Sequence, residues 1–234
     1  GLHKMEKNLK HVAIIGGGIM GISSALYLIR RGCKVTIIEK EPNGEPASYG
    51  NASWLSSSSI TPVLMPGAIF KIPKMLFSRD GPLFLNFPGV LRILPWLLKY
   101  LSYSSEVKVN YISDHLAPLL SNSFEEHKKL AEGTDALKWI VNSPFLFIYK
   151  NREDYIRETL TWNIRKKHGF KPIEIGKDEL SALVPGLSEE YTFAIKINNH
   201  GYISNSKKYL NDLIEINKSL IIQIQNKYMN KLKV

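Results

Sequence analysis

A glycine-rich turn between an apolar run and a helical repeat constrains this chain more than any other feature. His11–Ile15 is short and apolar, and Gly16, Gly18 and Gly21 follow it with the spacing Gly-x-Gly-x-x-Gly. Apolar residues then recur at helical spacing for about three turns, and the β-branched run Val35–Ile38 comes next. A strand, a glycine turn, a helix and a second strand within about thirty residues predict a parallel βαβ unit.

Each glycine of the turn has its own physical reason. Gly16 permits the tight turn, Gly18 lets the backbone approach a diphosphate, and Gly21 lets the helix pack closely on the sheet. The helix N-terminus near Ile19 offers unpaired N–H groups and about half a positive charge, which stabilise a diphosphate without a lysine. Glu39 ends the second strand, where its carboxylate can accept both ribose hydroxyls and would repel a 2′-phosphate. These features predict a site for the ADP half of FAD or NAD, and they disfavour NADP.

The residues that we expect to bind the cofactor lie in this turn, at the end of the second strand and in the loop that follows. They are Gly16, Gly17, Gly18, Ile19, Met20, Gly21, Glu39, Lys40, Ser48 and Asn51. Ser48 and Asn51 belong to a stretch rich in Pro, Gly, Asn and Ser, whose small side chains let the backbone approach a ligand. The alternative interpretation of that stretch is an ordinary connecting loop. The alternative interpretation of the three glycines is an ordinary turn that binds no ligand.

The sequence identifies no catalytic side chain, so the catalytic residues stay unknown. The sequence contains no Gly-x-Ser-x-Gly, no His-Glu-x-x-His and only one cysteine, and its six histidines are scattered, so neither a nucleophile nor a metal site is expected. His200 precedes Gly201 and could face a site. A lone histidine is more often a surface residue or a satisfied core residue.

The net charge and the cysteine count limit which binding partners and which cellular compartment we expect for this chain. The formal net charge is +10, but the lysines are dispersed and no basic run is interleaved with stacking aromatics, so no nucleic-acid partner is expected. Cys33 is the single cysteine and cannot form an internal disulfide, which is consistent with a cytoplasmic protein. No apolar segment reaches the roughly 18 residues of a membrane span.

One apolar segment has a second interpretation. Leu91–Leu101 carries Trp96 and Tyr100 together with Arg92 and Lys99. Such a helix could lie on the inner face of a membrane near a quinone electron acceptor. Packing in the core of the protein is the alternative, and we favour it.

Five stretches of the chain carry a family resemblance. The stretch GGGIMGISSALYLIRRGCKVTIIEK from Gly16, SYGNAS at Ser48–Ser53 and PVLMPG at Pro62–Gly67 resemble the N-terminal part of bacterial D-amino acid dehydrogenases and of the D-amino acid oxidase-like family of FAD-dependent oxidoreductases. LSALVPGL at Leu180–Leu187 and HGYISNSKKYLNDL at His200–Leu213 resemble later landmarks of that family. The resemblance implies FAD as the cofactor, a small-molecule amino acid or amine substrate, and hydride transfer from its amine-bearing carbon to flavin N5.

Three departures from the family pattern are visible. Members usually have Asn-Ala-Gly where Asn51, Ala52 and Ser53 stand, and they commonly carry Asp-Pro where Ser204 and Asn205 stand. Family chains also continue well beyond the length seen here. The resemblance therefore implies an N-terminal portion, truncated at its C-terminus.

The expected fold class is α/β, with a Rossmann-type FAD-binding domain interleaved with an α+β substrate domain. The expected boundaries are 11–60 and 200–234 for the FAD-binding domain and 61–199 for the substrate domain, with 1–10 as leader or vector-derived residues. The expected function is oxidation of an amine-bearing carbon in amino acid catabolism, with a D-amino acid as the expected substrate. A non-catalytic truncated remnant and an NAD-linked dehydrogenase remain as alternatives.

Overall fold

The computed structural model describes residues 10–39, 47–67, 87–215 and 221–224. The chain divides into two compact units, each built from separate segments. The first unit holds the chain up to Leu55, Phe124–Ser143 and the chain from Gly201 on. The second unit holds Ser56–Ser123 and Pro144–His200.

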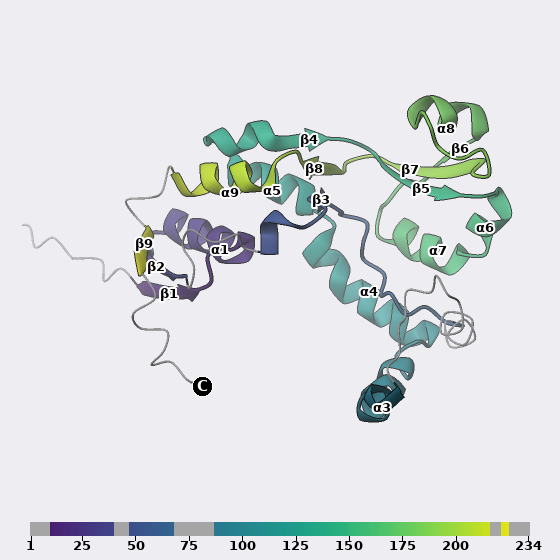
Figure 1. Ribbon diagram of the computed structural model, residues 1–234, viewed down its shortest axis with the longest axis horizontal. Coiled ribbons are helices and arrows are strands. Elements are labelled where there is room, and N and C mark those ends of the chain that lie inside the picture. The colour runs from purple at the N-terminus through teal and green to yellow at the C-terminus, as the bar shows by residue number, and fades with distance from the viewer. Residues whose placement is uncertain (1–9, 40–46, 68–86, 216–220, 225–234) are drawn as a thin grey trace, which may run out of the picture. The chain divides into compact units, whose positions relative to one another are not determined.

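A three-stranded parallel sheet with one covering helix forms the part of the first unit that contains the glycine turn (Figure 1). Its elements are β1 (His11–Ile15), α1 (Ile19–Arg30), β2 (Lys34–Ile38) and β9 (Ile221–Ile224). β2 is central, paired in parallel with β1 from His11↔Lys34 to Ile15↔Ile38 and with β9 from Val35↔Ile221 to Ile38↔Ile224. The expected βαβ unit is therefore present, and β9 adds a third parallel strand beside β2.

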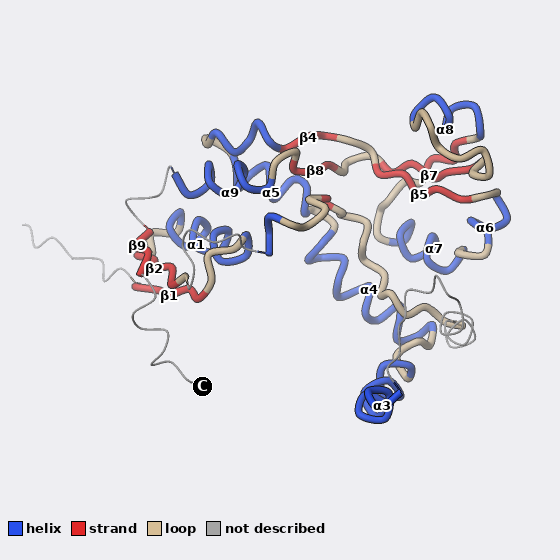
Figure 2. The backbone as a smooth tube through the Cα atoms, in the orientation of Figure 1, coloured by secondary structure: helices blue, strands red, loops and turns tan. Residues whose placement is uncertain are grey.

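The remaining elements of the first unit are short, and Figure 2 separates their helices from their strands. They are η1 (Ala47–Tyr49), β3 (Trp54–Leu55), α5 (Ser123–Ala131), η3 (Asp135–Trp139), β4 (Ile140–Asn142), β8 (Gly201–Ile203) and α9 (Ser206–Glu215). β3, β8 and β4 form an antiparallel sheet with β8 in the middle. Gly201 is required there, because a Cβ at this position would lie 2.3 Å from Phe124 Cε2 and 2.5 Å from the Val141 carbonyl oxygen.

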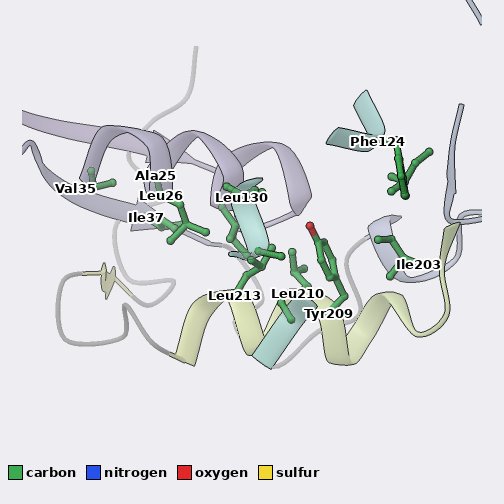
Figure 3. Packing of buried hydrophobic residues seen from close by; sticks show 14 residues of the cluster. Ala25, Leu26, Val35, Ile37, Phe124, Leu130, Ile203, Tyr209, Leu210 and Leu213 are labelled. Carbon is green, nitrogen blue, oxygen red and sulfur yellow. The ribbon is translucent and has the colours of Figure 1, made fainter. Parts of the chain in front are cut away.

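One hydrophobic core joins these elements. Its fully buried centre comes from α1, β2, α5 and α9 and includes Ala25, Leu26, Val35, Ile37, Leu130, Leu210 and Leu213. Figure 3 shows these side chains together. Residues 124–143, expected in the substrate domain, group with the first unit, and burial of the α5 residues Phe124 and Leu130 in this core is the physical reason.

The second unit combines helices with an antiparallel sheet in the order β5-β7-β6. Its elements are α3 (Phe87–Leu101), α4 (Glu106–Leu120), β5 (Phe145–Tyr149), α6 (Arg152–Ile156), α7 (Thr159–Lys167), β6 (Ile173–Ile175), α8 (Lys177–Leu183) and β7 (Phe193–Ile197). α3 runs for 15 residues and contains Pro95.

Candidate cofactor-binding site

The glycine turn after β1 has the backbone shape that its sequence requires. Gly16 has φ of +99°, in the left-handed region where a Cβ is strained and glycine is not. Its N–H donates to the carbonyl oxygen of Ile38 at 2.8 Å. The turn is thereby attached to the carboxyl end of the neighbouring strand, the edge at which parallel α/β sheets bind ligands.

Gly21 is the glycine with the least room. A Cβ there would lie 1.9 Å from the carbonyl oxygen of Gly16 and 3.1 Å from its carbonyl carbon, while the Ile14 side chain would be at 3.4 Å. The expected reason for this glycine was close packing of the helix on the sheet. The tighter contact is with the backbone of the turn itself, so Gly21 allows the first turn of α1 to cross directly over Gly16.

Gly18 is the N-cap of α1 and leaves the helix N-terminus open. Its backbone is extended, with φ −74° and ψ −176°, no side chain caps the helix from this position, and the first turn contains no acidic residue. The Ile19 N–H instead donates to Ser48 Oγ at 3.1 Å. A Cβ on Gly18 would lie 3.3 Å from the same hydroxyl oxygen. Gly18 itself thus adds no side-chain atom at this helix N-terminus, where backbone N–H groups favour an anion, and the Ser48 hydroxyl accepts one of these N–H groups.

Glu39 lies beside this turn although it is 22 residues away in sequence. Its Oε2 accepts a hydrogen bond from the Gly17 N–H at 2.5 Å. A carboxylate has about four lone-pair sites, and the bond from Gly17 uses one of them. The contact fixes the carboxylate at the end of β2, where the sequence predicts the ribose.

Most of the expected site residues are brought together in this way. The turn glycines, Ile19, Glu39 and Ser48 surround the N-terminus of α1, whereas the Met20 side chain is 77% exposed. Asn51 contributes to the wall of an adjoining pocket. Lys40 falls outside the described residues.

The adjoining pocket has a volume of about 150 Å³ and opens beside Ile19. Polar residues that the sequence analysis did not single out contribute to its wall, namely Ser53, His127, Ser206 and Tyr209. They lie in three segments that only tertiary packing brings together, so no local motif marks them.

Two of these pocket residues form a partly buried neutral pair. His127 Nδ1 and the Tyr209 hydroxyl oxygen are 2.9 Å apart. Burial lowers the pKa of His127 and raises the pKa of Tyr209, because it disfavours the charged form of each group. The pair therefore adds a hydrogen-bonding surface to the pocket without adding a charge.

The residues present fit the ADP moiety. A left-handed glycine, a helix N-terminus with glycine as its N-cap residue and a carboxylate at the end of β2 supply a tight turn, anion-binding donors and a ribose acceptor. In the described part of the chain, no group of three or more His, Cys, Asp or Glu residues is placed to hold a metal ion. No helix within that part is both long and apolar enough to cross a membrane.

His200 is a satisfied core histidine of the second unit. Its side chain is fully buried, Nδ1 lies 3.1 Å from the Asn198 carbonyl oxygen, and the Ser58 N–H donates to Nε2 at 3.1 Å. Nε2 is therefore the acceptor, and Nδ1 carries the proton. Burial lowers the pKa of His200, which keeps the ring neutral. These contacts give the residue a structural role.

Arg165 is fixed in the same buried region. Its Nε donates to the Ser58 carbonyl oxygen at 3.2 Å, and its guanidinium carbon lies 4.3 Å from the Phe147 ring centroid and 4.6 Å from that of Trp162. Burial lowers the pKa of this guanidinium. Stacking on two aromatic faces is a known way to hold a desolvated arginine, so this residue joins the loop at Ser58 to α7 and β5.

Comparison with known proteins agrees with this geometry. The family model described as FAD dependent oxidoreductase, abbreviated DAO, matches residues 11–227. A D-amino-acid oxidase of Bradyrhizobium diazoefficiens is 36% identical over 204 residues, which cover 86% of this chain and 48% of that protein. A D-amino acid dehydrogenase of Helicobacter pylori is 29% identical over 158 residues, which cover 65% of this chain and 37% of that protein.

Solved structures share the fold at lower identity. An L-proline dehydrogenase from P. horikoshii has a TM-score of 0.58 at 18% identity, with 93% of this chain and 44% of that chain covered. A glycine oxidase from Bacillus cereus has a TM-score of 0.52 at 18% identity, with coverages of 93% and 46%. The chain thus spans about half the length, or less, of the relatives it matches. Since the family model matches nearly the whole chain, the chain belongs to the DAO family of FAD-dependent oxidoreductases.

Proposed function

We propose that the first unit of this chain binds the ADP half of FAD at the turn Gly16–Gly21 and at Glu39. We propose further that it supplies the cofactor-binding part of an enzyme that oxidises the amine-bearing carbon of an amino acid. The observation that carries the proposal is the joint geometry of the turn, in which a left-handed glycine, a helix N-terminus with glycine as its N-cap residue and the Glu39 carboxylate meet at the end of β2.

In this proposal the flavin supplies the redox chemistry when bound, and the protein supplies binding and orientation. The first-turn N–H groups of α1 and their partial positive charge stabilise the diphosphate. The Glu39 carboxylate accepts the ribose hydroxyls while it keeps its bond to the Gly17 N–H. Because the flavin supplies the redox chemistry, no protein nucleophile is needed.

A D-amino acid is the proposed substrate class. The support is the similarity to a protein named D-amino-acid oxidase at 36% identity. We assign the first unit to the FAD-binding domain and the second unit to part of the substrate domain. Because each unit is built from separate segments of the chain, this assignment makes the two domains interleaved. The alternatives are a remnant without turnover and an NAD-linked dehydrogenase that uses the same ADP-binding unit.

Substitution of Glu39 by Gln tests the ribose assignment. We expect the dissociation constant for FAD to rise about tenfold, because hydrogen bonds that involve a charged group contribute roughly 1.5–3 kcal/mol. Titration of FAD with the purified chain, followed by flavin fluorescence, measures this change. Parallel titrations with NAD and NADP distinguish an FAD-binding chain from an NAD-linked dehydrogenase.

Glu132→Gln is the matched control, because it removes the same charge from an exposed residue of the same unit. The control should bind FAD like the unchanged chain. Equal binding by Glu39→Gln and the unchanged chain would contradict the ribose assignment, and tight binding of NAD without FAD binding would support the NAD-linked dehydrogenase.

We also propose that α3 rests on the surface of an anionic membrane, where a quinone could accept the electrons. The core packing that we favoured for this segment is wrong for its described side chains, because Trp96 is 62% and Leu98 60% exposed. The Trp96 and Tyr100 rings stack at 5.1 Å. Arg92 and Lys99 are exposed beside them. Exposed apolar and aromatic side chains with flanking cations favour binding at the interface of anionic lipids.

Co-sedimentation with vesicles tests the membrane proposal. We expect Trp96→Ser to reduce binding to vesicles containing phosphatidylserine by about five- to tenfold, since a buried aromatic side chain contributes roughly 1–2 kcal/mol or more. Tyr191→Ser, in the same unit but away from α3, is the control. The proposal fails if the unchanged chain stays in the supernatant with anionic vesicles.

A further inference from the structure

We propose that Ser53 and Ser206 are positioning residues for the cofactor. Their hydroxyl groups hold the loop of residues 48–53 against α9, and this contact keeps Ser48 at the N-terminus of α1. The inference rests on the proposed function, because the cofactor is placed at that helix N-terminus.

Ser53 has a backbone conformation that favours glycine. Its φ is +57°, in the left-handed region that costs a residue with a Cβ roughly 1 kcal/mol or more. Asn51 Oδ1 accepts the Ser53 N–H at 2.8 Å and lies 3.1 Å from Ser53 Oγ. The strained residue is therefore held by a side chain of its own loop.

Ser53 is also attached to the segment that leads into α9. Its Oγ hydrogen-bonds Ser206 Oγ, and its carbonyl oxygen accepts the Ile203 N–H at 2.8 Å. Tyr49 adds another connection, because its hydroxyl donates to Asn211 Oδ1 at 3.3 Å. Residues far apart in sequence thus fix the two ends of the short loop.

The other contact of the loop is with the cofactor-binding turn. Ser48 Oγ accepts the Ile19 N–H at 3.1 Å and would touch a Cβ on Gly18. Ser48, Ser53 and Ser206 all line the pocket beside Ile19. A shift of the loop away from α9 would therefore move the hydroxyl that meets the first N–H of α1.

Substitution of Ser53 distinguishes a role in positioning the cofactor from a role in the stability of the fold. Ser53→Gly removes the backbone strain, which by itself favours the folded state, and it also removes the hydroxyl that bonds Ser206. A residue with only a structural role would give a chain of equal or greater thermal stability and unchanged FAD affinity. A positioning residue gives stability that is unchanged or higher together with weaker FAD binding.

The experiment compares Ser53→Gly and Ser206→Ala with Ser204→Ala. Ser204 is two residues before Ser206, but its hydroxyl donates to the Trp139 carbonyl oxygen at 3.1 Å and not to the loop. We expect the first two variants to weaken FAD binding by about three- to tenfold, which corresponds to one lost hydrogen bond. Ser204→Ala should bind FAD like the unchanged chain.

Amide hydrogen exchange of the chain without FAD supplies an independent readout. We expect residues 47–53 and the Ile19 amide to exchange faster in Ser206→Ala and to keep their rates in Ser204→Ala. Unchanged exchange in Ser206→Ala, or equal FAD affinity in all variants, would overturn the inference. If the unchanged chain binds no FAD, the proposed function fails, and the exchange rates still decide whether Ser206 holds the loop.

Discussion

Gly21→Ala is expected to lower the free energy of unfolding of the first unit by about 3 kcal/mol, at the upper end of what overpacking costs. A Cβ at this position would lie 1.9 Å from the Gly16 carbonyl oxygen. The atom in the way is backbone, so relief requires the turn or the helix to move. Denaturant unfolding followed by circular dichroism measures the change.

Ser24→Ala is the control for this substitution, because Ser24 is an exposed position of the same helix. Alanine has the highest helix propensity, and Gly→Ala within an ordinary helix stabilises by about 1 kcal/mol. Ser24→Ala should therefore leave stability equal or slightly higher. A stabilising Gly21→Ala would show that α1 does not cross the turn as closely as described.

Gly18→Val should have the opposite profile, with the fold kept and the cofactor lost. The extended backbone of Gly18 suits a β-branched residue, and the nearest atom to an added Cβ, Ser48 Oγ at 3.3 Å, needs to move by only a small amount. The branched side chain would cover the N–H groups proposed to meet the diphosphate. We expect FAD affinity to fall by about 100-fold or more, equivalent to losing two charge-assisted hydrogen bonds.

Gly176→Val provides the matched control. Gly176 is also the N-cap of a helix, α8, with an extended backbone and no side-chain cap, and it lies in the second unit. Space around its Cβ position is open. Fluorescence titration with FAD should show normal affinity for Gly176→Val. Normal affinity in Gly18→Val as well would contradict the proposed diphosphate site.

The βαβ unit could be predicted from sequence because its signals are local. The glycine spacing, the helical repeat and the β-branched run each lie within a few residues of the element that they specify. Gly32, with φ of +80°, follows the C-terminus of α1, where a left-handed glycine is common. The position of Glu39 beside Gly17 follows from the same unit. These parts of the fold and of the site could be predicted without knowing which residues far apart in sequence are in contact.

The antiparallel sheet and the pocket could not be predicted in this way. β3 and β8 have two and three residues, too few to show an alternating pattern. His127 and Ser206 reach the pocket only because α5 and α9 pack into the core of the first unit. The boundary of the first unit at Phe124 depends on the same packing, so no change in composition marks it.

Gel filtration of the purified chain with added FAD, followed by visible absorption spectroscopy of the protein peak, tests the central claim most directly. We predict that a folded species elutes with the yellow flavin spectrum. We also predict that excess ADP competes with FAD and lowers the amount of flavin in the protein peak. A folded but colourless protein peak would contradict the claim that the Gly16–Gly21 turn and Glu39 bind FAD.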